Sequence, residues 1–154
     1  MVCANVLSLF YAYGRGQELN RTYQWVYEVL FHRAYLDGTR YYVTPECFLF
    51  SLSRLIGCSD NWELHKHLKP LLTDRIQERI GVSGDSLALA MRILACKSMG
   101  IRDEVDLNAL LALQCDDGGW EVCWIYKYGS SGIKIGNRSL TTAFAINAII
   151  AMEQ

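Results

Sequence analysis

The chain has 154 residues, of which 51% are hydrophobic and 20% are charged, and its formal net charge is −1. This composition supplies enough apolar material for one core, and the near-neutral charge indicates neither nucleic acid nor acidic lipid as a partner. Charged residues interrupt every apolar run, so no segment reaches the roughly 20 residues that a membrane span needs.

Two further features favour a reducing, cytoplasmic location. The sequence does not open with a basic region followed by an apolar core and a cleavage site, as a signal peptide does. Its cysteines lack C-x-x-C spacing and mostly lie in apolar stretches, where a reduced thiol behaves as a small hydrophobe. The six are Cys3, Cys47, Cys58, Cys96, Cys115 and Cys123.

The first half of the chain predicts an alternation of apolar and amphipathic helices. Residues 2–13 are apolar on almost every side, which is typical of a buried inner helix, and Gly14 ends it. Residues 22–35 have apolar side chains at three- and four-residue spacing, which predicts an outer helix. The next helix, over 44–57, is again mostly apolar, and Pro45 suits its first turn.

The second half repeats this alternation. Residues 61–80 form an amphipathic, charged pattern that Pro70 is expected to kink or divide. Apolar helices are predicted over 87–99 and 143–152, and Asp106 is expected to open a short outer helix between them. The expected opening residues are Asp85 or Ser86 for the first apolar helix and Ser139 or Thr141 for the second.

The predicted inner helices begin at similar intervals along the chain. Their starts lie near Val2, Pro45, Ser86 and Thr142, about 40 to 55 residues apart, which is the range of helical hairpin repeats. The prediction is therefore an all-α fold, a partial α/α toroid of about seven helices in inner and outer hairpin pairs. A non-toroidal helical bundle with the same amphipathic pattern is the alternative.

A turn motif at the end of the short outer helix is more specific. Residues 110–120 read L-x-x-x-Q-x-x-D-G-G-W. Gly118 and Gly119 are expected to permit a turn with φ > 0, which bulkier residues avoid. That turn would bring the indole of Trp120 beside the amide of Gln114. The structural motif is Gln114, Asp117, Gly118, Gly119 and Trp120.

This motif resembles the QW repeat of terpenoid cyclases, the α/α-barrel family that includes the squalene cyclases. The resemblance implies that the glutamine side chain stacks on the tryptophan and bonds to the start of a neighbouring helix, in a structural role. The sequence departs from the family at Ala109, where an aromatic residue is usual.

A closed barrel in that family uses roughly twice as many helices as the seven predicted here. Residues 1–154 are therefore predicted to be a single segment, from the C-terminal part of a longer cyclase-like domain. The expected protein partner is the missing upstream helical segment, or a second copy of the chain bound through the open edge.

A narrower resemblance involves residues 2–11, 34–42 and 44–50. They look like the C-terminal part of the β domain of drimane-type class II sesquiterpene cyclases, in which a D-x-D-T-T motif protonates farnesyl diphosphate. Neither D-x-D-T-T nor D-x-D-D occurs here, so no catalytic residue is assigned. The resemblance implies a prenyl diphosphate ligand, no cofactor in this chain, and Mg²⁺ as a possible companion of the diphosphate.

Class II cyclisation also needs a cavity whose π faces stabilise carbocations. Candidates are the aromatic residues at helix starts and after Trp120, although ordinary core packing is the alternative for each. These residues are Tyr41, Tyr42, Phe48, Phe50, Trp124, Tyr126 and Tyr128.

The segment 126–142 has the composition of an anion site. It contains three glycines and the cations Lys127, Lys134 and Arg138, and it leads into a helix N-terminus, where backbone N–H groups bind anions. Lys134 and Arg138 are the candidate diphosphate contacts. The alternative is a solvated connection that forms a short hairpin.

Other chemistries have less support. His65 and His67 lie about 200° apart around a helix, so a shared zinc ion is not predicted. Protein prenyltransferases share the toroid but need a later histidine, and none follows His67. No nucleophile elbow supports a hydrolase. Two hypotheses remain: a segment of a class II terpene cyclase, or a non-catalytic helical interaction module.

Overall fold

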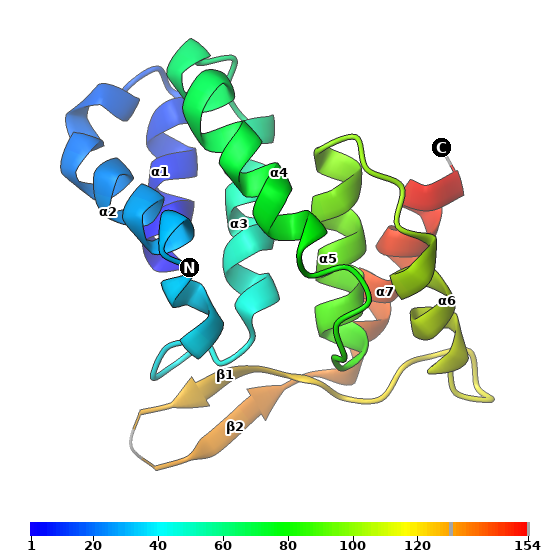
Figure 1. The fold of residues 1–154 in the computed structure, drawn as a ribbon. Helices are drawn as coiled ribbons and strands as arrows, with labels where there is room; N and C mark the ends of the chain where they lie inside the picture. The colour runs from blue at the N-terminus through cyan, green and yellow to red at the C-terminus, as the bar shows by residue number, and fades with distance from the viewer. Residues whose placement is uncertain (130, 154) are drawn as a thin grey trace.

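The computed structural model describes residues 1–129 and 131–153, which are mostly helical (Figure 1). The helices in this part of the chain are α1 (Val2–Ala12), α2 (Asn20–Phe31), α3 (Pro45–Gly57), α4 (Lys69–Gln77), α5 (Ser86–Ser98), α6 (Glu104–Ala112) and α7 (Arg138–Glu153). Short helical turns are η1 (Gly16–Leu19), η2 (Ala34–Asp37) and the π-helical η3 (Leu64–Leu68). An antiparallel hairpin joins β1 (Trp124–Tyr128) to β2 (Ile133–Gly136). The all-α prediction is confirmed, with this small hairpin added.

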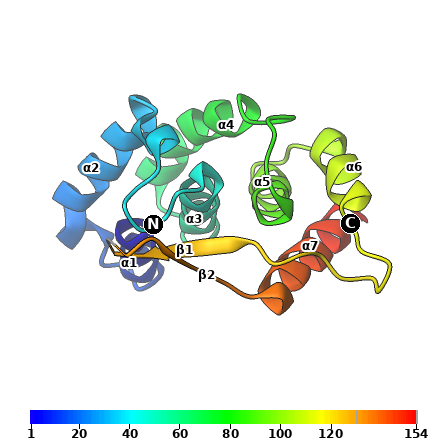
Figure 2. The same ribbon diagram turned by 90° about the horizontal axis from the view of Figure 1, so that it is seen from below.

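The helices form two layers arranged as an arc (Figure 2). Helices α1, α3, α5 and α7 make up the inner layer, in which each contacts the next, while α2, α4 and α6 cover it from outside. Three inner helices begin at the predicted residues. The fourth, α7, begins at Arg138 instead of near Thr142, because the side chain of Asn137 accepts a hydrogen bond from Leu140 N–H (3.2 Å) and caps the helix earlier.

Local backbone geometry moves two other boundaries. Helix α2 ends at Phe31, before the predicted residue 35, because Arg33 adopts a left-handed φ of 56°. Helix α6 begins at Glu104, capped by Asp103, whose side chain accepts from Asp106 N–H (3.1 Å). The prediction that Asp106 opens this helix was therefore wrong.

Pro70 lies where the 61–80 segment passes from the π-helical turn η3 into α4, and the backbone stays helical there, with Leu68 and Lys69 in the αR conformation. The predicted division of the helix is therefore not observed. The wider π turn, in which Lys69 N–H donates to Leu64 O, directly precedes the proline, which has no N–H to donate. Of the helices in residues 1–129 and 131–153, none has the length and hydropathy to cross a bilayer.

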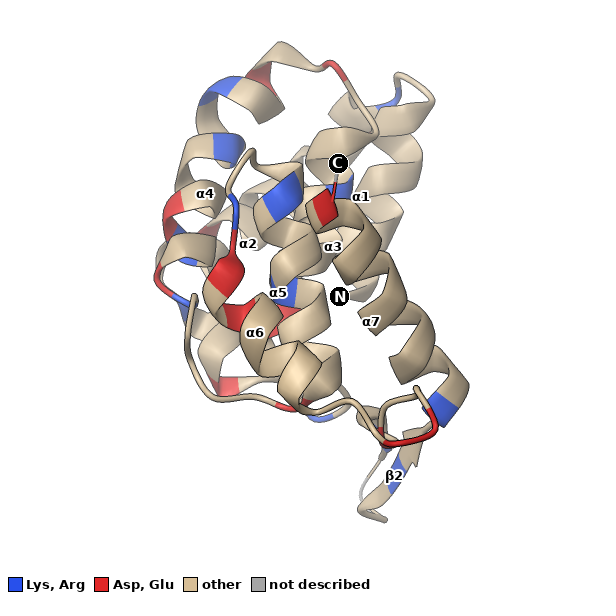
Figure 3. Cartoon of the chain, turned by 90° about the vertical axis from the view of Figure 1, so that its right-hand side faces the viewer, with Lys and Arg blue, Asp and Glu red and all other residues tan. Residues whose placement is uncertain are grey.

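The prediction that α1 is buried on nearly every side was wrong. Only Ala4, Leu7 and Tyr11 are buried, whereas Leu9 and Tyr13 are 57% and 76% exposed. The reason is position, because α1 stands at one end of the arc and has a single neighbour in the inner layer. Helix α7 stands at the other end, and it carries no charged residue between its first and last positions (Figure 3).

Trp120 holds α5, α6 and α7 together. Its ring is 1% exposed and packs in an apolar cluster drawn from those three helices. The indole N–H donates to Leu110 O (2.8 Å), and the backbone N–H donates to Thr142 Oγ1 (3.1 Å). The turn before Trp120 thus fixes α6 against the first turns of α7.

The two glycines of this turn have different roles, contrary to the prediction that both permit φ > 0. Only Gly118 has a positive φ, of 83°. A Cβ atom on Gly119 would lie 2.9 Å from Arg138 Nη2, so the absence of a side chain there makes room for the guanidinium. Gln114 closes its own turn by donating to Gly118 O (2.8 Å), whereas the resemblance implied a bond to the start of a neighbouring helix.

Candidate functional site

The candidate residues lie at the end of the fold where α3, α5 and α7 begin, and the β1–β2 hairpin crosses this end (Figures 1 and 2). Two hydrogen bonds donated by backbone N–H groups fix the hairpin there. Lys127 N–H donates to Tyr41 O (2.7 Å), and Cys123 N–H donates to Thr141 Oγ1 (3.2 Å). The hairpin is therefore tied both to the segment before α3 and to the start of α7.

Three of the predicted aromatic residues meet beside the hairpin. The rings of Tyr41 and Tyr126 stack with centroids 5.8 Å apart, and Tyr42 meets Tyr126 edge to face at 5.5 Å. Trp124 and Tyr128 come from the same strand and are 41% and 61% exposed. The structure thus brings together side chains that are about 85 residues apart in the sequence.

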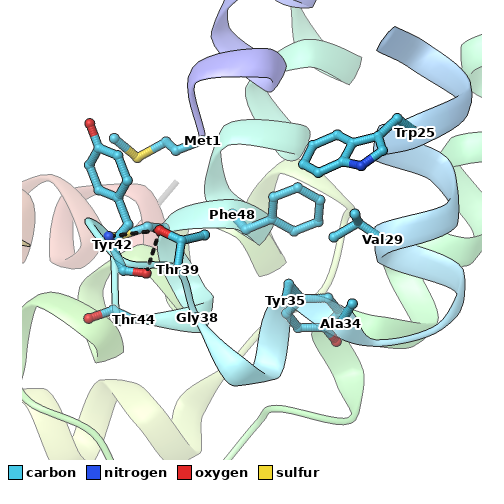
Figure 4. A pocket seen from close by; sticks show the side chains of 11 residues that line it. Met1, Trp25, Val29, Ala34, Tyr35, Gly38, Thr39, Tyr42, Thr44 and Phe48 are labelled. Atoms are coloured by element: carbon cyan, nitrogen blue, oxygen red, sulfur yellow. Dashed lines mark hydrogen bonds between the residues drawn. The ribbon is translucent and has the colours of Figure 1, made fainter. Parts of the chain in front are cut away.

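A cavity of about 190 Å³ lies beside this aromatic group, between α2, η2 and α3 (Figure 4). Phe48, which stacks on Tyr35 at 5.6 Å, lines it together with Tyr42. Phe50 packs elsewhere, edge to face against Phe144 at 5.5 Å. Trp25 also lines the cavity, where it is 55% exposed. It was not predicted as a lining residue, because the three- and four-residue spacing over 22–35 does not distinguish cavity-lining from core side chains.

The two candidate diphosphate contacts lie on different elements. Lys134 is exposed on β2 and is the register partner of Lys127 on β1. Arg138 begins α7 and donates to Asp117 Oδ1 (2.6 Å). This bond, followed by the bond from Gly119 N–H, lowers the pKa of Asp117 to about 2. The carboxylate also offsets the unfavourable position of a cation at a helix N-terminus.

A buried ion cluster, which the sequence analysis did not identify, links the two layers. Arg92 on α5 is 1% exposed and donates to Glu46 Oε1 (3.0 Å) and to both carboxylate oxygens of Asp106 (3.0 Å). Arg79 also donates to Glu46 (2.6 Å), and Gly81 N–H donates to Asp106 (3.1 Å). A lone arginine within the apolar α5 was the available signal, because a buried charge requires a partner.

The acidic groups of this cluster are structural. Burial, followed by the hydrogen-bonded Asp103 carboxyl, raises the pKa of Asp106 to about 6, although Arg92 acts in the opposite direction. Asp103 and Asp106 are the two aspartates of the D-E-V-D sequence; Asp103 caps α6, and Asp106 pairs with Arg92. Neither is placed as an acid facing the cavity near Phe48, which α2, η2 and α3 enclose.

Metal-ligating side chains do not gather in threes within residues 1–129 and 131–153. His65 is bonded through Nε2 to Ser59 O (2.9 Å), and His67 meets Trp62 edge to face at 6.2 Å. The two imidazoles therefore have separate partners. The candidate site described above consists of aromatic, apolar and cationic side chains.

Comparison with known proteins supports a terpene cyclase relationship. The chain is 47% identical over 149 residues to the drimenol cyclase of Aspergillus calidoustus, and the alignment covers 97% of this chain but 28% of that enzyme. No protein-family profile matches the sequence, and no solved structure matches it. The chain is thus similar, over nearly its whole length, to a part of a terpene cyclase.

Proposed function

We propose that the chain acts as a segment of a class II terpene cyclase-like protein and contributes aromatic and apolar wall to the cavity in which a prenyl diphosphate is cyclised. The observation that carries this proposal is the 47% identity to a drimenol cyclase across 97% of the chain. The chain spans 28% of that relative's length, so the complete reaction requires residues that lie outside this sequence.

The site geometry supports a role in holding substrate. Stacked and edge-to-face rings of Tyr41, Tyr42 and Tyr126 supply π faces of the kind that stabilise carbocations. The sequence contains no D-x-D-T-T or D-x-D-D motif. The proposed role is therefore to shape and shield the reaction, while a carboxylic acid from another segment supplies the proton.

The isolated chain is expected to form no cyclic product from farnesyl diphosphate, because it lacks the acid motif. The chain would be incubated with farnesyl diphosphate and Mg²⁺, and the products analysed by gas chromatography, with the drimenol cyclase relative as positive control. A cyclic product above the level of a boiled sample would contradict the prediction. An in-frame D-x-D-T-T sequence within about one domain length upstream in the gene would support the proposed role.

Diphosphate contacts from Lys134 and Arg138 form a second part of the proposal, with Mg²⁺ accompanying the ligand. Pyrophosphate would have to compete with Asp117 for Arg138, since the two side chains are 2.6 Å apart. Changing both Lys134→Ala and Arg138→Ala is expected to weaken pyrophosphate binding by about 1.5 to 3 kcal/mol for each charge-assisted bond lost.

Calorimetry at fixed salt measures this effect, because exposed charges alone give only weak, screened attraction. The matched control is Lys66→Ala with Lys69→Ala, which removes two cations from η3 and α4 and leaves the hairpin intact. Equal affinities for the two double variants would show that the hairpin is only a solvated connection.

A non-catalytic interaction module is the second candidate function. It is favoured by the two end helices, since α1 contains no charged residue and Val2, Leu9, Ile146 and Ile150 are between 45% and 62% exposed. An uncharged helix is usually covered, either by the rest of a longer chain or by a second copy. An unrelated upstream domain in the gene would favour this module over the enzyme.

A further inference from the structure

The cavity near Phe48 has walls without a charged side chain. Trp25 and Val29 from α2 and Phe48 from α3 lie on one side, and Tyr42 and Thr39 lie on the other (Figure 4). The complete set is Met1, Trp25, Val29, Ala34, Tyr35, Gly38, Thr39, Tyr42, Thr44, Cys47 and Phe48. Such walls offer dispersion contacts and π faces to a ligand but no cationic side chain to a phosphate. The α-amino group of Met1 is the one ionisable cation on a lining residue, and burial lowers its pKa, which favours the neutral amine.

Polar side chains in the lining are uncharged, and one of them, the Tyr35 hydroxyl, is buried without a hydrogen-bond partner within the described residues. The Thr39 hydroxyl accepts from Tyr42 N–H (2.9 Å) and from Tyr41 N–H (3.3 Å), and it donates to Tyr42 O (3.3 Å). Burial raises the pKa of the Cys47 thiol to about 12, so this group is uncharged at neutral pH. An anionic ligand group would therefore lose its hydration here without gaining a cationic side chain as a partner.

The volume limits the size of the ligand. A cavity of about 150 Å³ with apolar walls stays dry and binds benzene, so a cavity of about 190 Å³ takes a somewhat larger molecule. At the packing density of protein interiors, this space holds roughly eight to ten carbon atoms. A chain of fifteen carbons would not fit entirely within it.

We propose that this cavity binds a neutral hydrocarbon group of about ten carbons, equivalent to two isoprene units, and excludes the diphosphate. The choice of an isoprenoid among hydrocarbons rests on the proposed function, whereas the neutrality and size of the ligand rest on the lining and volume alone. The π faces of Trp25 and Phe48 contact the hydrocarbon, and any charged head group remains in solvent.

Calorimetric titration of the full 154-residue chain with geraniol tests the proposal, with geranyl diphosphate and farnesol as comparison ligands. Geraniol is expected to bind with one-to-one stoichiometry, at least tenfold more tightly than geranyl diphosphate. Val29→Phe, which fills the space, is expected to weaken geraniol binding at least tenfold. Val105→Phe is the matched control, because Val105 is 59% exposed on α6 and does not line the cavity.

Trp25→Ala provides a second variant if Val29→Phe fails to fold, and it is also expected to weaken binding at least tenfold because it removes one wall. Absence of saturable geraniol binding to the wild-type chain would overturn the proposal, as would equal binding to Val29→Phe and Val105→Phe. Tighter binding of geranyl diphosphate would also overturn it. The geraniol titration involves no turnover. Geraniol binding can therefore be absent even if the cyclase assay of a longer protein yields a cyclic product.

Discussion

Replacing Trp120 by alanine is expected to lower the free energy of unfolding by about 3 to 5 kcal/mol, against a total of about 5 to 15 kcal/mol for a domain. The indole is 1% exposed, and it packs against residues from α5, α6 and α7. The substitution removes the ring from that cluster and also its hydrogen bond to Leu110 O. Urea unfolding followed by circular dichroism measures the loss.

Trp62→Ala is the matched control for this change. Trp62 is 65% exposed and contacts the Lys66 ammonium at 4.3 Å from its ring centroid, an exposed cation–π contact of about 0.5 to 1 kcal/mol. If the two variants lost the same stability, Trp120 would not be holding the layers together, and the assignment of the glycine turn as an anchor would be wrong.

The starts of α3 and α5 could be predicted from the sequence because their signals are local, whereas α6 and α7 begin earlier than predicted. Pro45 suits a first turn, and the Asp85 side chain accepts from Ala88 N–H (2.9 Å), so α3 and α5 begin where capping rules place them. The end of α2 could not be predicted in this way. Arg33 takes a left-handed conformation without being glycine, and no periodicity reports such a residue.

Which side chains form the site depends on contacts between distant segments. Tyr41 and Tyr126 were both candidates, but their stacking requires the β1–β2 hairpin to run under the inner helices and bond to the segment before α3. Trp25 shows the limit of helical spacing. Trp25 and Val26 both belong to the apolar pattern of α2, but Val26 is fully buried, whereas Trp25 lies at the cavity and is half exposed.

The ion cluster also depends on contacts between distant segments that the sequence does not reveal. Arg92 is the only charged residue in the apolar middle of α5, so the sequence indicates that its charge needs a partner. The partners themselves are 46 and 14 residues away, on α3 and α6. Only the packing of α5 between those helices identifies Glu46 and Asp106 as the groups that neutralise it.

Arg92→Met is expected to lower the free energy of unfolding by about 3 to 5 kcal/mol, because it leaves two carboxylates buried without their shared partner. Glu46 and Asp106 are 2% and 1% exposed. Arg79 still reaches Glu46 (2.6 Å), but within the described residues the only other donor to the Asp106 side-chain oxygens is Gly81 N–H. Urea unfolding gives the size of the loss.

Arg33→Met is the matched control, because it removes an arginine from a pair whose side chains are 45% and 40% exposed. Exposed pairs contribute about 0.2 to 1 kcal/mol, since water already solvates both charges. Combining Arg92→Met with Glu46→Gln should cost less than the sum of the two single changes, because the second change removes one of the charges that the first leaves unpaired. Strict additivity would mean that Arg92 and Glu46 do not depend on each other, and the cluster would then not be the link between α3 and α5.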